Sequence, residues 1–241
     1  MKFITKKTLA VVLFGGSVLF LWWCKNTQVY ENQQATNSEY VVDQSDILDS
    51  SIVSNIVTSW GLSDQEKIWL IQMREEEKLA RDVYTTLWAK WGNKIFTNIA
   101  QSEQTHTQAV KNLLDAYALP DPVTDDTIWV FVSPTMQKLY TDLVSQWSAS
   151  LLDALIVWAT IEDLDIKDLN VLLQETSNPA IISVYDNLNR GSRNHLRAYI
   201  KNINNNNGTY IPQYISQWEY TDIVSSQQER GSAWMRNGAA R

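Results

Sequence analysis

The sequence predicts an all-α protein built on an antiparallel four-helix bundle, with a broken third helix and an irregular C-terminal tail. Apolar residues recur at spacings of three and four over most of residues 63–203, and residues that typically begin or end helices stand at the ends of these stretches. Strand patterns are nearly absent, and no segment repeats another. With 241 residues, of which 44% are hydrophobic, the chain is long enough for one packed domain plus additional segments.

Residues 1–24 have the pattern of a bacterial lipoprotein export signal. Three lysines within the first seven residues precede an apolar stretch at 9–21, which is shorter than the roughly 20 residues that a membrane-spanning helix requires. The only cysteine, Cys24, follows this stretch, and in lipoproteins such a cysteine carries the lipid and becomes the mature N-terminus. We therefore expect an extracytoplasmic protein, anchored to the bacterial cell membrane through Cys24. An uncleaved signal anchor is the alternative.

The next segments separate this signal from the helical domain. Residues 25–60 are rich in Asn, Gln, Ser and Asp and are expected to form a flexible polar spacer. The bundle is expected over residues 61–204. Ser63 and Glu66 form a capping box for a first helix, which runs to about Lys90 and ends at residues 91–93. A second helix is expected from about Lys94 to Tyr117, before two prolines.

The second half of the domain begins after a connector at residues 121–132, part of which is expected to be extended. Pro134 opens the third helix, which breaks near Trp147, restarts at residues 148–150 and continues to about Leu164. A further helical piece is expected from Asp165 to Gln174. Asn178 and a proline start the last long helix, and residues 205–241 are expected to be irregular.

Tryptophan is over-represented and glycine is scarce. The chain has 11 Trp and 8 Gly, whereas an average glycine usage of about 7% would give roughly 17. Trp22 and Trp23 stand where a signal peptidase prefers small side chains, and Trp147 stands where a helix end favours glycine. One hypothesis is that some of these codons are UGA and are read as glycine in the organism. The alternative is a protein truly rich in tryptophan. Trp88 and Trp91 continue an apolar helical face and are expected to be genuine.

Charge and cysteine content exclude several classes of function. The net charge of −7, without a basic stripe to neutralise phosphates, argues against a nucleic-acid partner. A single cysteine excludes a disulfide within the chain and a metal cluster held by several thiolates.

Glu103 and His106 are the first candidates for chemistry. Both lie within the apolar stripe of the second helix, which also holds Phe96, Ile99, Ala100, Val110 and Leu113. Burying a carboxylate and an imidazole is costly unless they are paired or coordinated. A Glu-x-x-His pair on the inner face of a four-helix bundle is a unit from which dimetal carboxylate sites are built.

The other long helices each add candidates. Glu77 lies in the apolar stripe of the first helix, with its neighbour Glu76 as the alternative. At about 1.5 Å per residue, Glu77 and His106 reach nearly the same level of an antiparallel hairpin, because they stand at similar distances from its turn. Glu162 lies in the stripe of the third helix and His195 in that of the last, so both histidines of the chain face inward.

Three segments, residues 73–84, 96–106 and 190–197, resemble an uncharacterised family of bacterial and archaeal ferritin-like domains, and the resemblance covers residues 62–214. The chain is more distantly similar to rubrerythrin and ferritin. The resemblance implies a ferritin-like bundle that binds iron, two ions in the symmetric case. Imidazole and carboxylate ligands also suit manganese or zinc. It also implies glycine at five tryptophan positions: Trp69, Trp129, Trp147, Trp158 and Trp218.

The resemblance further implies a role for each candidate residue. Glu77, Glu103 and Glu162 would be carboxylate ligands, His106 and His195 nitrogen ligands, and Tyr84 a hydrogen-bond donor to a ligand. The last helix departs from the pattern, because Ser192 stands where a second Glu-x-x-His would have its acid, and Asp165 is the candidate for the missing oxygen ligand.

The function expected from these residues is metal binding, with redox chemistry on oxygen or peroxide as the implied activity. A non-catalytic cell-surface module for metal binding or for interaction with another molecule is the alternative. Whether the protein is an enzyme stays open at the level of the sequence, as does its oligomeric state.

Overall fold

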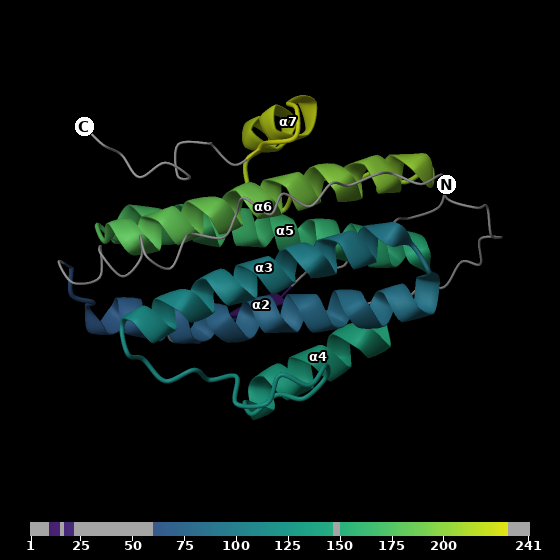
Figure 1. The fold of residues 1–241 in the computed structure, drawn as a ribbon. Coiled ribbons are helices and arrows are strands. Elements are labelled where there is room, and N and C mark those ends of the chain that lie inside the picture. The colour runs from purple at the N-terminus through teal and green to yellow at the C-terminus, as the bar shows by residue number, and fades with distance from the viewer. Residues whose placement is uncertain (1–9, 15–16, 22–59, 147–149, 231–241) are drawn as a thin grey trace.

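The computed structural model describes residues 10–14, 17–21, 60–146 and 150–230. Four long helices, α2 (Asp64–Trp91), α3 (Lys94–Ala116), α5 (Leu151–Glu175) and α6 (Pro179–Asn205), lie side by side (Figure 1). Short turns join α2 to α3 and α5 to α6, so the chain forms two helical hairpins that meet mainly through α3 and α6. Residues 60–146 and 150–230 are all-helical apart from the connecting loops, as predicted.

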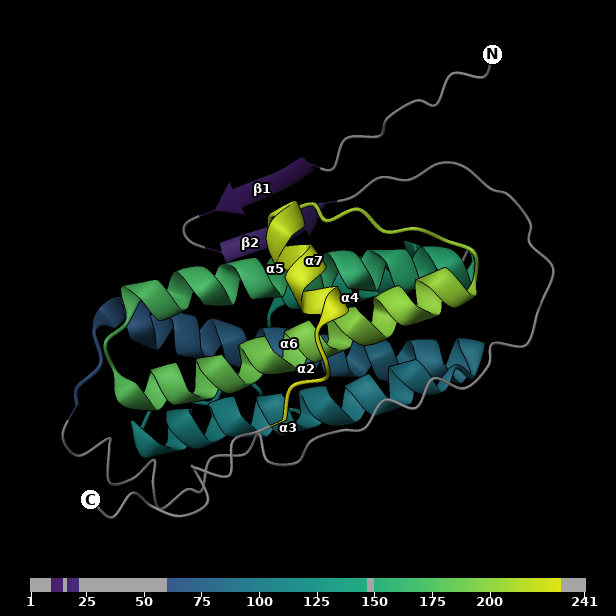
Figure 2. The same cartoon turned by 90° about the horizontal axis from the view of Figure 1, so that it is seen from above.

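Smaller elements surround the four long helices. The short helix α4 (Pro134–Gln146) packs against the outer side of α2, and α7 (Gln217–Ser225) lies over α6 (Figures 1 and 2). Near the N-terminus, β1 (Ala10–Phe14) and β2 (Ser17–Leu21) form an antiparallel pair within the expected export signal. In the described part of the chain, no helix has both the length and the apolar character that crossing a bilayer requires. Cys24 and the spacer to residue 59 fall outside the described residues.

The helix ends follow the capping chemistry of the sequence. Ser63 and Glu66 form the predicted capping box at the start of α2, in which each side chain binds the other residue's backbone N–H. Gly92 ends α2 in the left-handed region at φ 61°, which a glycine adopts without strain. Asn178 caps α6 and a proline occupies its first turn.

Two expectations about helix boundaries are wrong. We expected the helix that precedes Asp165 to end there, but α5 continues unbroken to Glu175, because buried Ile166 and Leu169 carry its apolar face past that point. The tail after residue 205, expected to be irregular, contains α7. The segment before α7 is fixed by Asp163, whose carboxylate accepts hydrogen bonds from the Tyr210 hydroxyl and from the backbone N–H groups of residues 213–215.

Side chains of α2 hold the connector between α3 and α4 in place through a hydrogen bond and an ion pair. Lys78 is buried and bonds both to Asp82 and to the backbone carbonyl of Thr127. Arg81 binds Asp126 of the connector, with guanidinium and carboxylate 2.8 Å apart. These contacts keep the connector in turns, without the extended stretch that the sequence suggested.

The tryptophans differ sharply in their surroundings. Trp129 adopts the left-handed backbone conformation at φ 66°, which is rare for bulky residues, and its side chain is 58% exposed. Trp158 is buried and packs on Tyr84 with ring centroids 4.1 Å apart. Trp88 is 46% exposed, so it does not continue the buried face of α2 as expected. Trp147 lies outside the described residues.

Replacing Trp129 with glycine is expected to stabilise the protein by about 1 kcal/mol, because glycine adopts positive φ without steric cost. Trp88→Gly is the matched control. It removes a similarly exposed indole from a helix interior, where glycine costs about 1 kcal/mol. Urea denaturation of both variants measures the two effects. If Trp129→Gly destabilises as much as Trp88→Gly, the argument from backbone conformation fails. Independently of this test, mass spectrometry of peptides from the organism that makes the protein shows which residue stands at position 129.

Candidate metal centre

Helix α3 contributes the central pair of the candidate site. Glu103 and His106 are one helical turn apart on its buried face, and His106 Nδ1 lies 2.8 Å from Glu103 Oε2. The face is buried because Ile99, Val110 and Leu113 flank the pair and pack into the core. The spacing therefore places a carboxylate and an imidazole together inside the protein.

Glu103 connects the two histidines of the chain. Its other oxygen, Oε1, lies 3.0 Å from Nδ1 of His195, which comes from α6. The two imidazole rings have centroids 5.7 Å apart. Each oxygen of one buried carboxylate thus faces a different imidazole nitrogen.

Two further carboxylates complete the cluster, one from each remaining long helix. Glu77 of α2 has Oε2 3.4 Å from His106 Nδ1, and Glu162 of α5 has Oε2 3.3 Å from His195 Nδ1. The atoms form two groups that share Glu103, and within each group they lie within 4.8 Å of one another. We call these five residues the centre. Its carboxylates and histidines are arranged so that they could hold metal ions.

Tyr84 fixes one of these carboxylates. Its hydroxyl donates a 2.7 Å hydrogen bond to Glu162 Oε1, which leaves Oε2 facing His195. The Tyr84 ring is buried between Trp158 and Tyr199, so its position is set by packing. Burial raises the pKa of Tyr84 well above its ordinary value, so the hydroxyl keeps its proton and remains a donor.

Burial and mutual charge set the ionisation of the metal-free centre. Burial raises the pKa of Glu77 to about 8. Burial acts in the same direction on Glu103, but the neighbouring His195 and His106 outweigh it and lower the pKa of that carboxyl. Burial lowers the pKa of an imidazole, yet Glu103 and Glu77 together raise the pKa of His106 to about 10. Without a metal the centre therefore needs bound protons to balance its carboxylates.

Three residues singled out in the sequence lie outside the two groups. Glu76 receives a hydrogen bond from Gln72, and burial raises its pKa to about 7, so of the two alternatives Glu77 is the one in the centre. Burial and then the negative charges around it, Glu162 first, raise the pKa of Asp165 well above its ordinary value. Ser192 donates its hydroxyl to the backbone of its own helix, at Leu188.

Gly191 is a residue of the site that the sequence reading missed. A Cβ at this position would lie 2.4 Å from Nε2 and Cε1 of His106, so only glycine lets α6 pass this close to the ring. His106 Nε2 is buried there and has no hydrogen-bond partner within the described residues. A glycine in the middle of a predicted helix, four residues before a histidine, is the signal that could have found it.

Gly191→Ala is expected to push His106 out of the centre and to destabilise the protein by about 1–3 kcal/mol, since the new methyl group overlaps the ring. Gly61→Ala is the control, because nothing lies within 4 Å of a Cβ at that position. Thermal unfolding and metal content of both variants test this. Unchanged stability and metal content in Gly191→Ala would contradict the close packing of α6 on His106.

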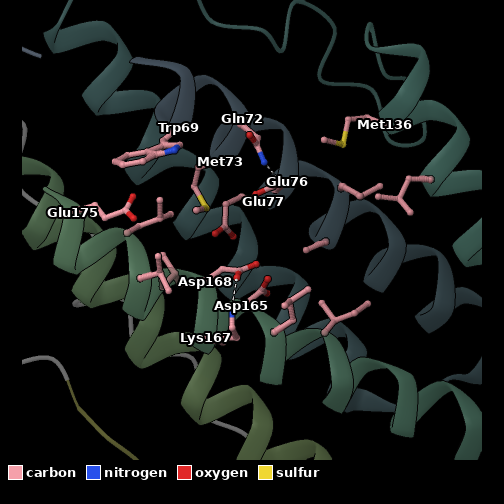
Figure 3. Close-up of a pocket in the computed structure, with 18 of the residues that line it drawn as sticks. Trp69, Gln72, Met73, Glu76, Glu77, Met136, Asp165, Lys167, Asp168 and Glu175 are labelled. Carbon is pink, nitrogen blue, oxygen red and sulfur yellow. Dashed lines mark hydrogen bonds and ion pairs between the residues drawn. The ribbon is translucent and has the colours of Figure 1, made fainter. Parts of the chain in front are cut away.

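A groove of about 680 Å³ opens beside the centre, between α2, α4 and α5 (Figure 3). Glu77 belongs both to the centre and to the wall of this groove. Its side chain is 12% exposed, more than that of any other member of the centre. The groove is therefore the side from which a molecule can reach the centre. Residues that line it include Trp69, Met73, Glu76, Ala80, Met136, Leu139, Leu143, Trp158, Leu164, Asp165 and Asp168.

The comparisons with known proteins agree with one another, and the matching domain and protein are described as uncharacterised or hypothetical. The sequence model of an uncharacterised protein domain, DUF2202, matches residues 66–227. The uncharacterised protein MJ0754 of Methanocaldococcus jannaschii is 56% identical over 170 residues, which are 70% of this chain and 92% of that protein. The crystal structure of the hypothetical protein MJ0754 has a TM-score of 0.68 to this chain at 54% identity, and the match covers 71% of this chain and 98% of that one. The matched region holds all five residues of the centre.

Proposed function

This chain belongs to the DUF2202 family of uncharacterised domains, and we propose that its helices form a ferritin-like four-helix bundle that binds two metal ions, with iron as the expected metal. The observation that carries the proposal is the position of Glu103. Its two carboxylate oxygens face the Nδ1 atoms of two histidines from different helices, at 2.8 and 3.0 Å. A carboxylate between two imidazoles in this way is suited to bridge two ions.

The ligands divide into two sets. Glu77, Glu103 and His106 would hold one ion, and Glu103, Glu162 and His195 the other. Three carboxylates and two neutral imidazoles supply three negative charges to two divalent ions, so metal binding would replace the protons that balance the metal-free centre. This mixture of nitrogen and oxygen donors suits iron, manganese and zinc, and iron is expected from the resemblance to rubrerythrin and ferritin.

Asp165 is proposed as an additional oxygen ligand. Ser192 stands where a symmetric site would have a fourth carboxylate, and its hydroxyl is directed to the helix backbone. Asp165 stands one turn after Glu162 on α5, and the charges of Glu162, Glu77 and Glu103 all act on it. Its carboxylate would supply the missing oxygen.

Redox chemistry with oxygen or peroxide is the activity we propose, and bound iron would supply the electrons for it. The chain supplies the surroundings. Glu103 would hold the two ions at a fixed separation, and the hydrogen bond from Tyr84 would keep Glu162 in one orientation. Glu77, at the groove, would be the ligand that an arriving molecule meets first. Buried side chains close the other sides of the centre and exclude bulk water.

The test is metal loading followed by reaction. Metal-free protein titrated with ferrous ion under anaerobic conditions is expected to bind two ions per chain, and the loaded protein is expected to consume peroxide faster than the same ferrous ion free in solution. A non-catalytic metal-binding module, the second candidate, would bind the ions and show no such acceleration. A protein that binds no metal would be an interaction module whose buried cluster is structural, and the proposal would then be wrong.

We also propose that the domain is held outside the cytoplasmic membrane by a lipid on Cys24, with residues 25–60 as the spacer. The support is the order of lysines, apolar stretch and single cysteine in the sequence. Mass spectrometry of the protein from its native membrane should find Cys24 as the acylated N-terminus. Recovery of a peptide that begins at Met1 would contradict this.

A further inference from the structure

The groove beside the centre is larger than oxygen or peroxide requires. Its volume is about 680 Å³, whereas a water molecule, which is comparable in size to these reactants, occupies about 30 Å³ in the liquid. Pockets that bind organic ligands have volumes of about 300–1,000 Å³ and mainly apolar walls with a few polar groups. The groove has this size and this composition, so it can hold an organic molecule against Glu77.

The two ends of the groove differ in chemistry. Toward α4, the walls are apolar side chains such as Met136, Leu139 and Leu143. Away from α4, the walls carry carboxylates among apolar side chains such as Trp69, and Figure 3 shows Met136 on the opposite side of Glu76 and Glu77 from Trp69 and Glu175. A ligand that fills the groove must therefore have an apolar part and a polar part.

The charges determine the sign of the polar part. Glu77 and Asp165 are proposed metal ligands, so bound ions balance their charge. The other charged residues that line the groove are Glu76, Asp168 and Glu175, against a single cation, Lys167. Lys167 lies 3.4 Å from Asp168 and is already engaged by it. An anionic ligand would thus meet repulsion along the polar half, while a cation would be attracted.

We propose that the groove is the binding site of an organic cation, in which a protonated amino group lies among the carboxylates next to Glu77 and an apolar chain extends along Leu139 toward α4. The proposal rests on the proposed function in one respect, since Glu77 is treated both as a metal ligand and as a wall of the groove. It adds a ligand class to the centre, because the bound molecule lies next to the ions.

Octylamine, octanol and octanoate are suitable probes, since they share a chain and differ in charge at neutral pH. Cobalt-loaded full-length protein is titrated with each, followed by calorimetry and by the visible absorption of the cobalt. Octylamine is expected to bind at least about tenfold more tightly than octanol and to alter the cobalt spectrum, and octanoate is expected to bind weakest. Binding of octanoate or octanol as tight as that of octylamine would overturn the proposal.

Two variants test the polar part and the apolar end of the groove separately. Glu76→Gln keeps the shape of the groove and is expected to weaken octylamine alone, whereas Leu139→Trp fills the apolar end and is expected to weaken all three probes by about tenfold. Lys138→Ala, on the exposed side of α4, is the control and should bind as the parent does. Parental affinity for octylamine in both groove variants would refute the site.

The two proposals fail separately. If the parent protein binds no metal but calorimetry still detects octylamine selectively, the metal centre is wrong and the groove stands. If the parent binds its metal ions and octylamine does not bind, the groove proposal alone is wrong.

Discussion

Glu103→Ala is expected to abolish binding of both metal ions at once, because Glu103 is the one carboxylate that belongs to both groups of ligands. Glu77→Ala and Glu162→Ala each touch one group and are expected to leave one ion bound with lowered affinity. Metal content measured by plasma mass spectrometry distinguishes these outcomes. Glu103→Gln repeats the test with the shape of the side chain retained.

Loss of metal in Glu103→Ala has a measurable effect on stability. A ligand at about 1,000 times its Kd stabilises a protein by about 4 kcal/mol, and for a domain of this size each kcal/mol shifts Tm by roughly 2–4 °C. The parent should therefore gain roughly 10 °C on metal addition and Glu103→Ala almost nothing. Glu75→Ala, next to the centre in sequence but in neither group, is the control and should behave as the parent. Two ions retained in Glu103→Ala would rule out the bridging role.

The metal-free protein is expected to lose stability as pH rises from about 5 to about 9. The folded pKa of Glu77, about 8, lies above the ordinary 4.5, so the stability linked to its proton is complete below 4.5 and is lost as pH rises through 8. The folded pKa of His106, about 10, lies above 6.5, so its contribution is complete below 6.5 and is lost as pH rises through 10. Glu103 acts in the opposite direction, with its lowered pKa, and its contribution is lost only in acid.

Because these groups share protons, the total loss is smaller than the separate pKa differences would give, and we expect about 3 kcal/mol. Urea denaturation of the metal-free protein at several pH values measures it. Glu77→Gln should flatten the part of the profile below pH 8. The metal-loaded protein should show the reverse slope, since metal binding requires the ligands to lose their protons. A flat profile for the metal-free parent would mean that the centre is solvated and does not hold these protons.

Much of the fold follows from local signals in the sequence. The capping box at Ser63, the glycine at 92 and the Asn178-Pro start of α6 act over a few residues, so they could be predicted without knowledge of the tertiary structure. The continuity of α5 could not, because Asp165 is an ordinary helix-capping residue and only tertiary packing keeps it inside the helix. The same holds for α7, since the tail is held by Asp163 through contacts about 50 residues away in the sequence.

The candidate site could be predicted in its members but not in its connections. Helical periodicity alone placed Glu103, His106 and His195 on inward faces, and the structure brings all three together. That the two oxygens of Glu103 divide between the histidines depends on how α6 meets α3. The close approach of α6 to His106 on α3 requires glycine at position 191, because a Cβ there would overlap the imidazole ring. The groove likewise depends on the position of α4. This helix packs on the outer side of α2 and does not continue the axis of α5.

The division of the centre between two hairpins has a consequence for the order of folding. The hairpins α2–α3 and α5–α6 are each local in sequence and are expected to form early, whereas their docking brings distant segments together. The first hairpin carries Glu77, Glu103 and His106, so three of the five ligands are assembled before docking, and Glu162 and His195 join only in the last step. The ion held by Glu103, Glu162 and His195 would then link the two hairpins, because its ligands come from both. It would slow their separation, and so unfolding, far more than it would speed folding.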